Sequence, residues 1–249
     1  EAIKWFCKAA EQGSANAQCS LGVSYYKGMG TAKDDVEAVK WFRKAAEQGD
    51  ALAQAALGIT YDKGEGVAKN GAEAVKWYRK AAEQGLAVAQ YNLGLCYVDG
   101  VGISKDEVEA VKWFLKAAEQ GLAEPQFYLG ICYANGKGIS KDEAEAVTWL
   151  RKSSDQGNAD AQYFLGGCYA DGIGILKDEM EAVKWYRKAA EQGFAVAQWN
   201  LGRSYAHGSG ISKDETEAAK WYRKAADQGD LDAMTDLGGC YDQGKGVAK

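Results

Sequence analysis

Residues 106–121 read DEVEAVKWFLKAAEQG, and near-copies of this stretch return at one fixed interval along the chain. Its tryptophan, Trp113, marks the interval, because a tryptophan recurs every 36 residues. The series is Trp5, Trp41, Trp77, Trp113, Trp149, Trp185 and Trp221. A period of this length indicates one supersecondary unit stacked about seven times.

The apolar residues of 106–121 fall on one side of a helix. Ala110, Trp113, Phe114 and Ala117 follow the i, i+3, i+4, i+7 spacing of an amphipathic helix, and charged residues occupy the other positions. We therefore predict a helix here and in every copy, and call these stretches the B segments.

Both ends of the B segment have helix-boundary residues. Asp106 is a good N-cap, and Glu109 has the spacing of a capping box, whose carboxylate reaches back to the N-cap N–H. Gly121 is expected to end the helix in the left-handed conformation. The N-cap and glutamate spacing recurs in Asp34/Glu37, Asn70/Glu73, Asp142/Glu145, Asp178/Glu181 and Asp214/Glu217.

A second helical pattern, the A segment, lies between consecutive B segments and is first complete at 15–30. Ala17, Leu21 and Tyr25 lie at helical spacing and form a stripe that we expect to meet the B segment. Gly22 in mid-helix costs about 1 kcal/mol relative to alanine. Its recurrence in every copy predicts a close approach of two helices. Each repeat is therefore predicted to be an antiparallel helical hairpin.

The charge pattern argues against two classes of partner. The chain has 30 Lys and Arg against 35 Asp and Glu, a net charge of -5, and the two signs alternate along every B segment. Nucleic-acid binding needs clustered basic residues. A membrane span needs about 20 consecutive apolar residues, and glycine interrupts every repeat before that length. We expect a soluble protein that neither binds nucleic acid nor inserts into a membrane.

The six cysteines predict neither a disulfide framework nor a metal site. Four of them, Cys96, Cys132, Cys168 and Cys240, share one repeat position, and equivalent positions lie about 10 Å apart in packed helices. A disulfide needs Cα atoms within about 7 Å. There is no C-x-x-C pair and only one histidine, so we predict no zinc site and no cofactor. Unpaired thiols favour a reducing compartment.

The repeat is A-x-A-Q-x-x-L-G-x-x-Y-x-x-G-x-G, then K-D-x-x-E-A-V-K-W-Y/F-R-K-A-A-E-Q-G. It resembles the Sel-1-like repeat family, a relative of the tetratricopeptide repeat, over essentially the whole chain. The resemblance implies an all-α, right-handed α-α superhelix of about seven helix-turn-helix repeats, whose members mostly act as non-catalytic adaptors or scaffolds for protein partners. We expect one solenoid over 1–249, with a half-repeat helix at 1–12, full repeats from 14 onward and a final helix and loop at 230–249.

Two other functions stay open. A cysteine-rich secreted branch of the family is linked to penicillin binding or hydrolysis, but Ala45, Ala46 and Ala53 occupy the sort of positions that would carry its cysteine pairs. That departure weakens the β-lactam interpretation. The chain also begins at Glu1 with an unpaired B segment and stops after 246–249 just before another, which suggests head-to-tail self-association. The same mid-repeat start suggests a processed or excised fragment, so a signal peptide upstream, and hence a periplasmic or secreted location, stays open.

Positions that differ between copies are free to encode a ligand. By resemblance to the tetratricopeptide repeat, the A segments line a concave groove, and two of their columns are aromatic in the middle repeats. Aromatic anchors suit peptide recognition, although one column could instead pack on the next repeat. The predicted partner-binding residues are Tyr91, Asn92, Leu95, Phe127, Tyr128, Ile131, Tyr163, Phe164, Trp199, Asn200, Arg203 and His207.

Polar residues of this set suggest how a peptide would be bound. Asn92 and Asn200 can bond a peptide backbone or a carboxylate. Arg203 and His207 lie one and two turns beyond Trp199 and place a charge-assisted donor beside the largest aromatic ring. His207 has no evident nucleophile partner, and the sequence has no nucleophile elbow or H-E-x-x-H motif, so we predict a protein that is not an enzyme.

Overall fold

The computed structural model describes residues 1–247, and within them every regular element is an α-helix. The prediction of an all-α chain built from helical repeats of 36 residues is confirmed. Odd-numbered helices come from the B segments and even-numbered helices from the A segments. The helices are α1 (Ala2–Glu11), α2 (Ala15–Lys27), α3 (Asp35–Glu47), α4 (Ala51–Lys63), α5 (Gly71–Glu83), α6 (Ala87–Asp99), α7 (Glu107–Glu119), α8 (Ala123–Asn135), α9 (Glu143–Asp155), α10 (Ala159–Asp171), α11 (Glu179–Glu191), α12 (Ala195–His207), α13 (Glu215–Ala226) and α14 (Leu231–Gln243).

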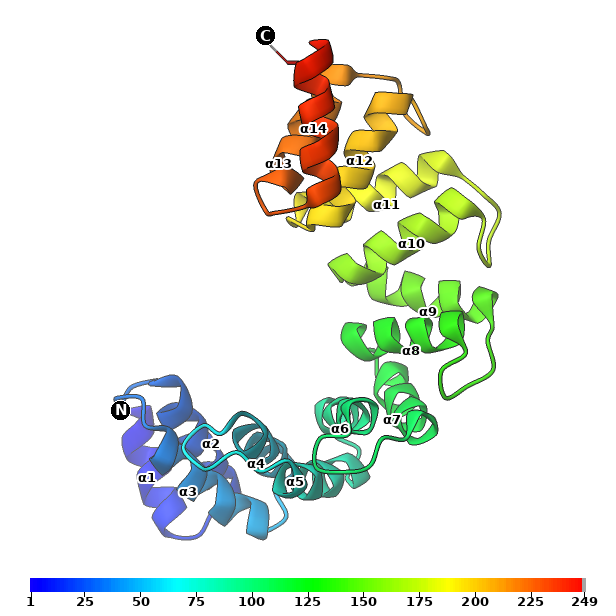
Figure 1. Ribbon diagram of the computed structural model, residues 1–249. Coiled ribbons are helices and arrows are strands. Elements are labelled where there is room, and N and C mark those ends of the chain that lie inside the picture. The colour runs from blue at the N-terminus through cyan, green and yellow to red at the C-terminus, as the bar shows by residue number, and fades with distance from the viewer. Residues whose placement is uncertain (248–249) are drawn as a thin grey trace. The chain divides into compact units, whose positions relative to one another are not determined.

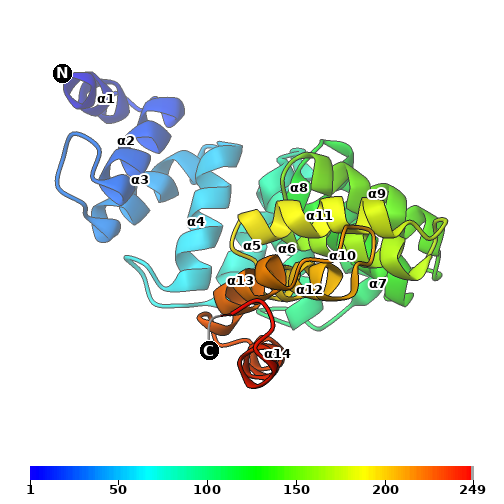
Figure 2. The same ribbon diagram turned by 90° about the horizontal axis from the view of Figure 1, so that it is seen from above.

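The chain divides into two compact units, Glu1–Gly121 with α1 to α7 and Leu122–Lys249 with α8 to α14. Within each unit, every helix packs beside the next one in sequence, which Figures 1 and 2 show from two directions. Each unit is therefore a stack of helical hairpins. The single solenoid over 1–249 stays a prediction.

The N-caps of the B helices are confirmed, but the capping box is wrong. Asp106 accepts a hydrogen bond from the Glu109 N–H at 3.0 Å, and the five equivalent residues accept in the same way. The Glu109 carboxylate pairs with Lys112 and does not reach back. The reason is that the Asp106 N–H already donates to the Tyr97 carbonyl of the preceding A helix, at 3.0 Å.

The mid-helix glycines of the A helices mark close helix approach, as predicted. A Cβ on Gly166 of α10 would lie 2.7 Å from ring carbons of Tyr186 in α11. A loop glycine is equally constrained: Gly174 has φ +66°, and a Cβ there would lie 2.1 Å from the Glu143 carbonyl oxygen. Glycine at these positions is therefore a packing requirement.

A buried glutamine in each inner A helix joins the B helices on either side. In α10, Gln162 is 4% exposed and donates through Nε2 to the Ser154 carbonyl of α9 at 3.1 Å. Its Oε1 accepts from Gln192 Nε2 at 2.8 Å, just beyond the end of α11. The second bond of the pattern recurs in Gln18/Gln48, Gln54/Gln84, Gln90/Gln120, Gln126/Gln156 and Gln198/Gln228.

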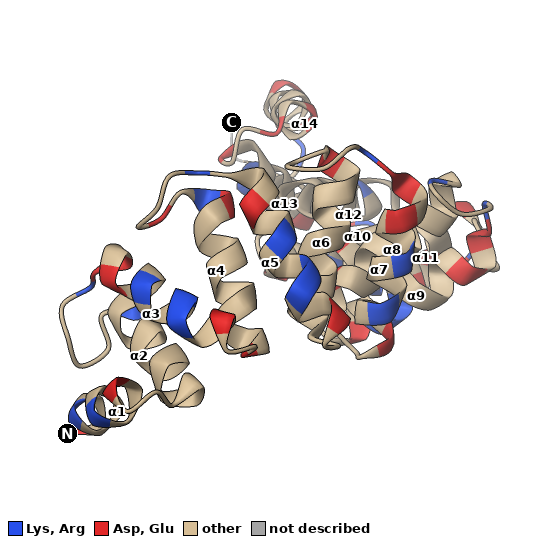
Figure 3. Ribbon diagram, turned by 90° about the horizontal axis from the view of Figure 1, so that it is seen from below, with Lys and Arg blue, Asp and Glu red and all other residues tan. Residues whose placement is uncertain are grey.

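Basic and acidic residues are interspersed over the helices of each unit (Figure 3). Several form lysine–glutamate pairs on exposed B-helix faces, such as Lys220 with Glu217 at 2.6 Å. Exposed pairs of this kind contribute about 0–1 kcal/mol each, so they matter more for solvation than for stability. No helix within residues 1–247 has the length and apolar character needed to cross a membrane.

Candidate functional site

The predicted partner-binding residues divide between the two units. Tyr91, Asn92 and Leu95 lie on α6 of the first unit. There Asn92 and Leu95 line a small pocket of about 160 Å³ with Tyr78. The Tyr91 ring packs on Phe114, with centroids 6.1 Å apart. The other nine residues lie on α8, α10 and α12 of the second unit, and we call them the A face: Phe127, Tyr128, Ile131, Tyr163, Phe164, Trp199, Asn200, Arg203 and His207.

One aromatic column of the A face is half-buried between hairpins. The Tyr163 ring lies 6.0 Å from the Tyr186 ring and 5.4 Å from the Phe194 ring, so two neighbouring segments enclose it. Phe127 packs against the core cluster of α9 to α11. Trp199 donates from Nε1 to Asp236 of α14 at 2.8 Å. These rings support the hairpin stack and expose only part of their surface.

In the neighbouring column, Phe164 is exposed, while Tyr128 and Asn200 are half-buried. Phe164 is 42% exposed, and its ring lies 5.6 Å from the Phe127 ring and 5.3 Å from the Tyr163 ring. Tyr128 stands edge-on to Phe127 at 5.5 Å. Together, α8 and α10 carry an aromatic surface. Phe127 and Tyr163 pack against the core cluster, and Phe164 lies over them and is exposed.

A pocket of about 430 Å³ lies beside this surface, between α10, α11 and α12. It brings together four of the predicted residues, one from α10 and three from α12: Tyr163, Asn200, Arg203 and His207. Phe127, Tyr128, Ile131, Phe164 and Trp199 are not part of its lining. The convergence arises because Asn200, Arg203 and His207 are three and four residues apart in turn on α12 and so lie on one helix face.

Several lining residues were not among the predicted partner-binding residues, and two of them, Gly167 and Tyr186, shape the pocket. Gly167 occupies the position of Leu95 and Ile131 in other A helices, and its missing side chain leaves space above Tyr186. A Cβ on Gly167 would lie 3.8 Å from the Tyr186 hydroxyl oxygen, its nearest neighbour. The available signal was that Gly167 is one of the few glycines outside the repeat motif.

Tyr186 forms the floor of the pocket and is 8% exposed. Burial raises the pKa of its hydroxyl above the usual value, and Tyr163 and Asp171 raise the pKa further, while Arg203 lowers it. The hydroxyl is therefore protonated at neutral pH. It forms no hydrogen bond within residues 1–247, so its proton is available to an acceptor in the pocket.

Two cations line the pocket, Lys177, which is paired with Glu179, and Arg203, which has no ion pair within residues 1–247. Its guanidinium carbon lies 4.8 Å from the Trp199 ring centroid, in a cation–π contact. Arg187 of α11, by contrast, donates to the Tyr205 hydroxyl at 2.9 Å. Arg203 has neither a hydrogen bond nor an ion pair with any residue of the described chain, and it is exposed. Its donors are free.

Asn200 makes one hydrogen bond inside its own helix. Its Nδ2 donates to the Val196 carbonyl of the same helix at 2.9 Å. Its second N–H and its amide oxygen remain, so the side chain can still donate to a carboxylate or accept from a peptide N–H. The lining also contains two acidic residues, Asp171 and Glu179, and Glu179 is paired with Lys177, another lining residue, at 3.1 Å.

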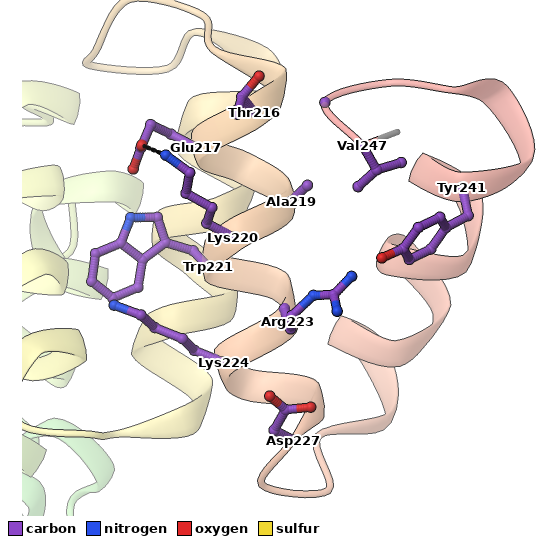
Figure 4. Close-up of a pocket in the computed structure, with 11 residues that line it drawn as sticks. Thr216, Glu217, Ala219, Lys220, Trp221, Arg223, Lys224, Asp227, Tyr241 and Val247 are labelled. Atoms are coloured by element: carbon purple, nitrogen blue, oxygen red, sulfur yellow. Dashed lines mark hydrogen bonds and ion pairs between the residues drawn. The ribbon is translucent and has the colours of Figure 1, made fainter. Parts of the chain in front are cut away.

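A larger pocket, of about 570 Å³, lies between α13 and the residues that follow α14. Figure 4 shows Arg223 of α13 pointing toward Tyr241 of α14, which is 43% exposed. The equivalent tyrosine of α10, Tyr169, is 8% exposed and packs in one cluster with Trp185 of the following helix. This pocket is therefore the place that a following B helix fills at inner repeats, and its shape follows from repeat packing.

The cysteines offer no separate site. All six are free, and burial raises the pKa of the Cys168 thiol. In the described part of the chain, no three His, Cys, Asp or Glu residues lie close enough together to hold a metal ion.

Comparison with known families finds matches to the Sel1 repeat along the chain. The matched segments are 1–14, 15–50, 51–86, 87–122, 125–158, 159–194, 195–230 and 231–249. Comparison with curated protein sequences finds no match.

Solved structures share the fold. A protective antigen of uropathogenic Escherichia coli strains that displays an SLR fold is 40% identical, with a TM-score of 0.93. The match covers 97% of this chain and 52% of the antigen, so this chain spans about half of that protein. A Sel1 repeat protein from Oxalobacter formigenes is also 40% identical, with a TM-score of 0.83, over 93% of this chain and 91% of its own.

Proposed function

The chain belongs to the Sel1 repeat family, and from this premise we propose that it is a non-catalytic adaptor that holds a peptide segment of a protein partner on the A face of its second unit. Sel1 repeat proteins generally mediate protein–protein interaction and are typically non-catalytic scaffolds. The comparisons give no support to β-lactam hydrolysis or to head-to-tail self-association, and neither is proposed here.

The observation that carries the proposal is the exposed ring of Phe164 on a fixed aromatic base. Phe127 and Tyr163 hold that ring from below, so little side-chain freedom is lost when a ligand covers it. Rigid aromatic surface next to a pocket with free polar groups is the usual composition of a binding hot spot. The pocket above Tyr186 supplies those polar groups.

Peptide selection on the full chain tests this function. Peptides are enriched from a random display library on the wild-type protein, and their affinities are then measured by fluorescence anisotropy. Phe164→Ser should weaken the enriched peptides by about tenfold or more, which is the usual effect of removing a hot-spot aromatic. Circular dichroism and thermal unfolding establish that the variant is folded.

Leu176→Ser is the matched control. Leu176 lies in the loop between α10 and α11 and is 89% exposed, so its replacement removes apolar surface outside the A face. It should leave the affinities unchanged. Failure to enrich any peptide, or a loss caused by Leu176→Ser and not by Phe164→Ser, would contradict the proposal.

A further inference from the structure

We propose that the pocket between α10, α11 and α12 is a carboxylate-binding subsite, so that the peptide held on the A face carries a carboxylate that enters beside Arg203 and Tyr186. This inference rests on the proposed function and names the chemistry of its ligand. The carboxylate belongs either to an aspartate or glutamate side chain or to the C-terminus of the peptide.

The inference rests on two hydrogen-bond donors without partners, one at the floor of the pocket and one at its rim. Tyr186 as a whole is 8% exposed, and its hydroxyl at the floor of the pocket has no hydrogen-bond partner within residues 1–247. Arg203 at the rim has five N–H donors and no hydrogen-bonding or ionic partner in the same residues. A carboxylate is an acceptor that can take hydrogen bonds from both donors at once.

The neighbours of Arg203 hold it in place. Trp199 lies under the guanidinium, and the Trp199 ring is itself fixed by the Nε1 hydrogen bond to Asp236. The arginine is therefore partly preorganised, and less conformational entropy is lost when it binds. The position is unusual within the repeat, because the equivalent residues of the other A helices are Val23, Ile59, Leu95, Ile131, Gly167 and Gly239.

Access to Tyr186 depends on Gly167. Because Gly167 has no side chain, the space above the hydroxyl is open, and the residues around it are half-buried Tyr163 and exposed His207. A side chain such as that of Leu95, at the equivalent position in α6, would enter this space.

The other charges of the lining decide what kind of anion fits. Besides Arg203, the charged lining residues are Glu179 and Lys177, which are paired with each other, and Asp171, which has no ion pair within residues 1–247. The unpaired carboxylate of Asp171 would repel a phosphate with close to two negative charges more strongly than a carboxylate with one. The Asn200 oxygen can accept a backbone N–H next to the bound carboxylate. The pocket therefore fits a peptide carboxylate better than a phosphopeptide.

Blocked amino acids test the subsite on the full chain. The probes are N-acetyl-glutamate N-methylamide for a side-chain carboxylate, N-acetyl-leucine for a C-terminal carboxylate, N-acetyl-glutamine N-methylamide as the neutral isostere, and N-acetyl-phosphoserine N-methylamide. Binding is followed by NMR through the Arg203 Nε–H and Tyr186 ring signals, up to concentrations that saturate a millimolar complex. At least one carboxylate probe should give saturable shifts at both residues, and the tighter of the two identifies the source.

Two variants locate the effect. Arg203→Ile places the residue of α8 at this position, and Gly167→Leu fills the pocket with the residue of α6. Each should weaken the carboxylate probe by about tenfold or more, the effect of losing a charged hydrogen bond or the space for the ligand. Gly238→Ala is the control, because it also replaces a helical glycine in the second unit, with open space around the new Cβ. It should change nothing.

The subsite is disproved if neither carboxylate probe gives saturable shifts, if the glutamine probe binds as tightly as the glutamate probe, or if phosphoserine binds more tightly than both carboxylates. If the probes fail while display-selected peptides still require Phe164, the adaptor function stands and only the carboxylate subsite is wrong. If the probes bind and no selected peptide requires Phe164, the pocket binds carboxylates and the proposed peptide site on the A face is wrong.

Discussion

The side-chain nitrogen of Gln192 lies 2.8 Å from the side-chain oxygen of Gln162, and this single bond joins the end of α11 to the interior of α10. Gln162 is buried, so its amide cannot turn to water if the bond is lost. The same pair recurs at successive repeats, so these hydrogen bonds connect each hairpin to the next one.

We predict that Gln162→Leu destabilises the second unit by about 1–3 kcal/mol, because the substitution removes two hydrogen bonds, to the Ser154 carbonyl and from Gln192, that are each worth about 0.5–1.5 kcal/mol. Urea unfolding followed by circular dichroism measures the change. Gln12→Leu is the control, since Gln12 is exposed and its side chain has no hydrogen bond in residues 1–247. If the two substitutions lower the free energy of unfolding equally, the hydrogen bonds of Gln162 do not contribute to stability.

Two adjacent glycines of α10 should respond to alanine with opposite signs. Gly166→Ala places a Cβ 2.7 Å from the buried Tyr186 ring, and relieving that overlap costs about 1–3 kcal/mol, more than the helix propensity of alanine returns. Gly167→Ala meets only the Tyr186 hydroxyl at 3.8 Å, so it should stabilise by up to about 1 kcal/mol. Urea midpoints of the two variants measure the signs, and midpoints that move in the same direction would contradict the packing explanation.

Removal of a B-helix cap should weaken its hairpin. Asp178 accepts from the Met180 and Glu181 N–H groups, both at 3.0 Å, and Asp178→Ala should cost about 1 kcal/mol in thermal or urea unfolding. Asp178→Asn should cost little, because Asn70 caps α5 at the equivalent position. If the asparagine variant is as unstable as the alanine variant, the negative charge and not the cap is what stabilises α11.

Cys96 should react slowly with alkylating reagents at neutral pH. Burial, with smaller contributions from Asp62 and Asp99, raises the pKa of its thiol from 9.0 to about 11, and only the thiolate is the nucleophile. In a variant with Cys96 as the sole cysteine, the iodoacetamide rate of the folded protein should rise with a midpoint near the raised value. The unfolded chain should react with a midpoint near 9.0. Coincident midpoints would contradict the prediction.

The same shift links Cys96 to stability at alkaline pH. The thiol is neutral in both states below pH 9.0, so its contribution is fully present there. As pH rises from that value through about 11, the unfolded thiol ionises first and the contribution is lost. The difference in unfolding free energy between the parent and Cys96→Ala should therefore shrink over this range.

The fold was predictable because its signals are local and repeated. The stripe of Ala110, Trp113 and Phe114 fixes a helix through its spacing alone, and Asp106 caps it through bonds three residues away. The role of Gly166 was also readable, because a helix-interior glycine that recurs in every copy has few explanations other than close packing. The capping box failed because the Asp106 N–H is taken by Tyr97, a partner from another helix.

The candidate site was predictable only in part. Arg203 and His207 could be placed on one face of α12 by helical spacing, but the floor of their pocket, Tyr186, comes from α11. The helical spacing of the B segment assigns Tyr186 to its apolar stripe, and the residue is indeed buried. Its hydroxyl becomes a pocket group only because Gly167 of α10 leaves the space above it empty.

The sequence by itself determined the repeat, the helices with their caps, and the positions that vary from copy to copy, because each of these follows from spacing along one chain segment. Tertiary structure alone decided which varied positions share a cavity, which aromatic rings are used for packing, and which donors are left without partners. Those outcomes depend on the neighbours that each side chain meets on the next helix, and helical spacing carries no information about them.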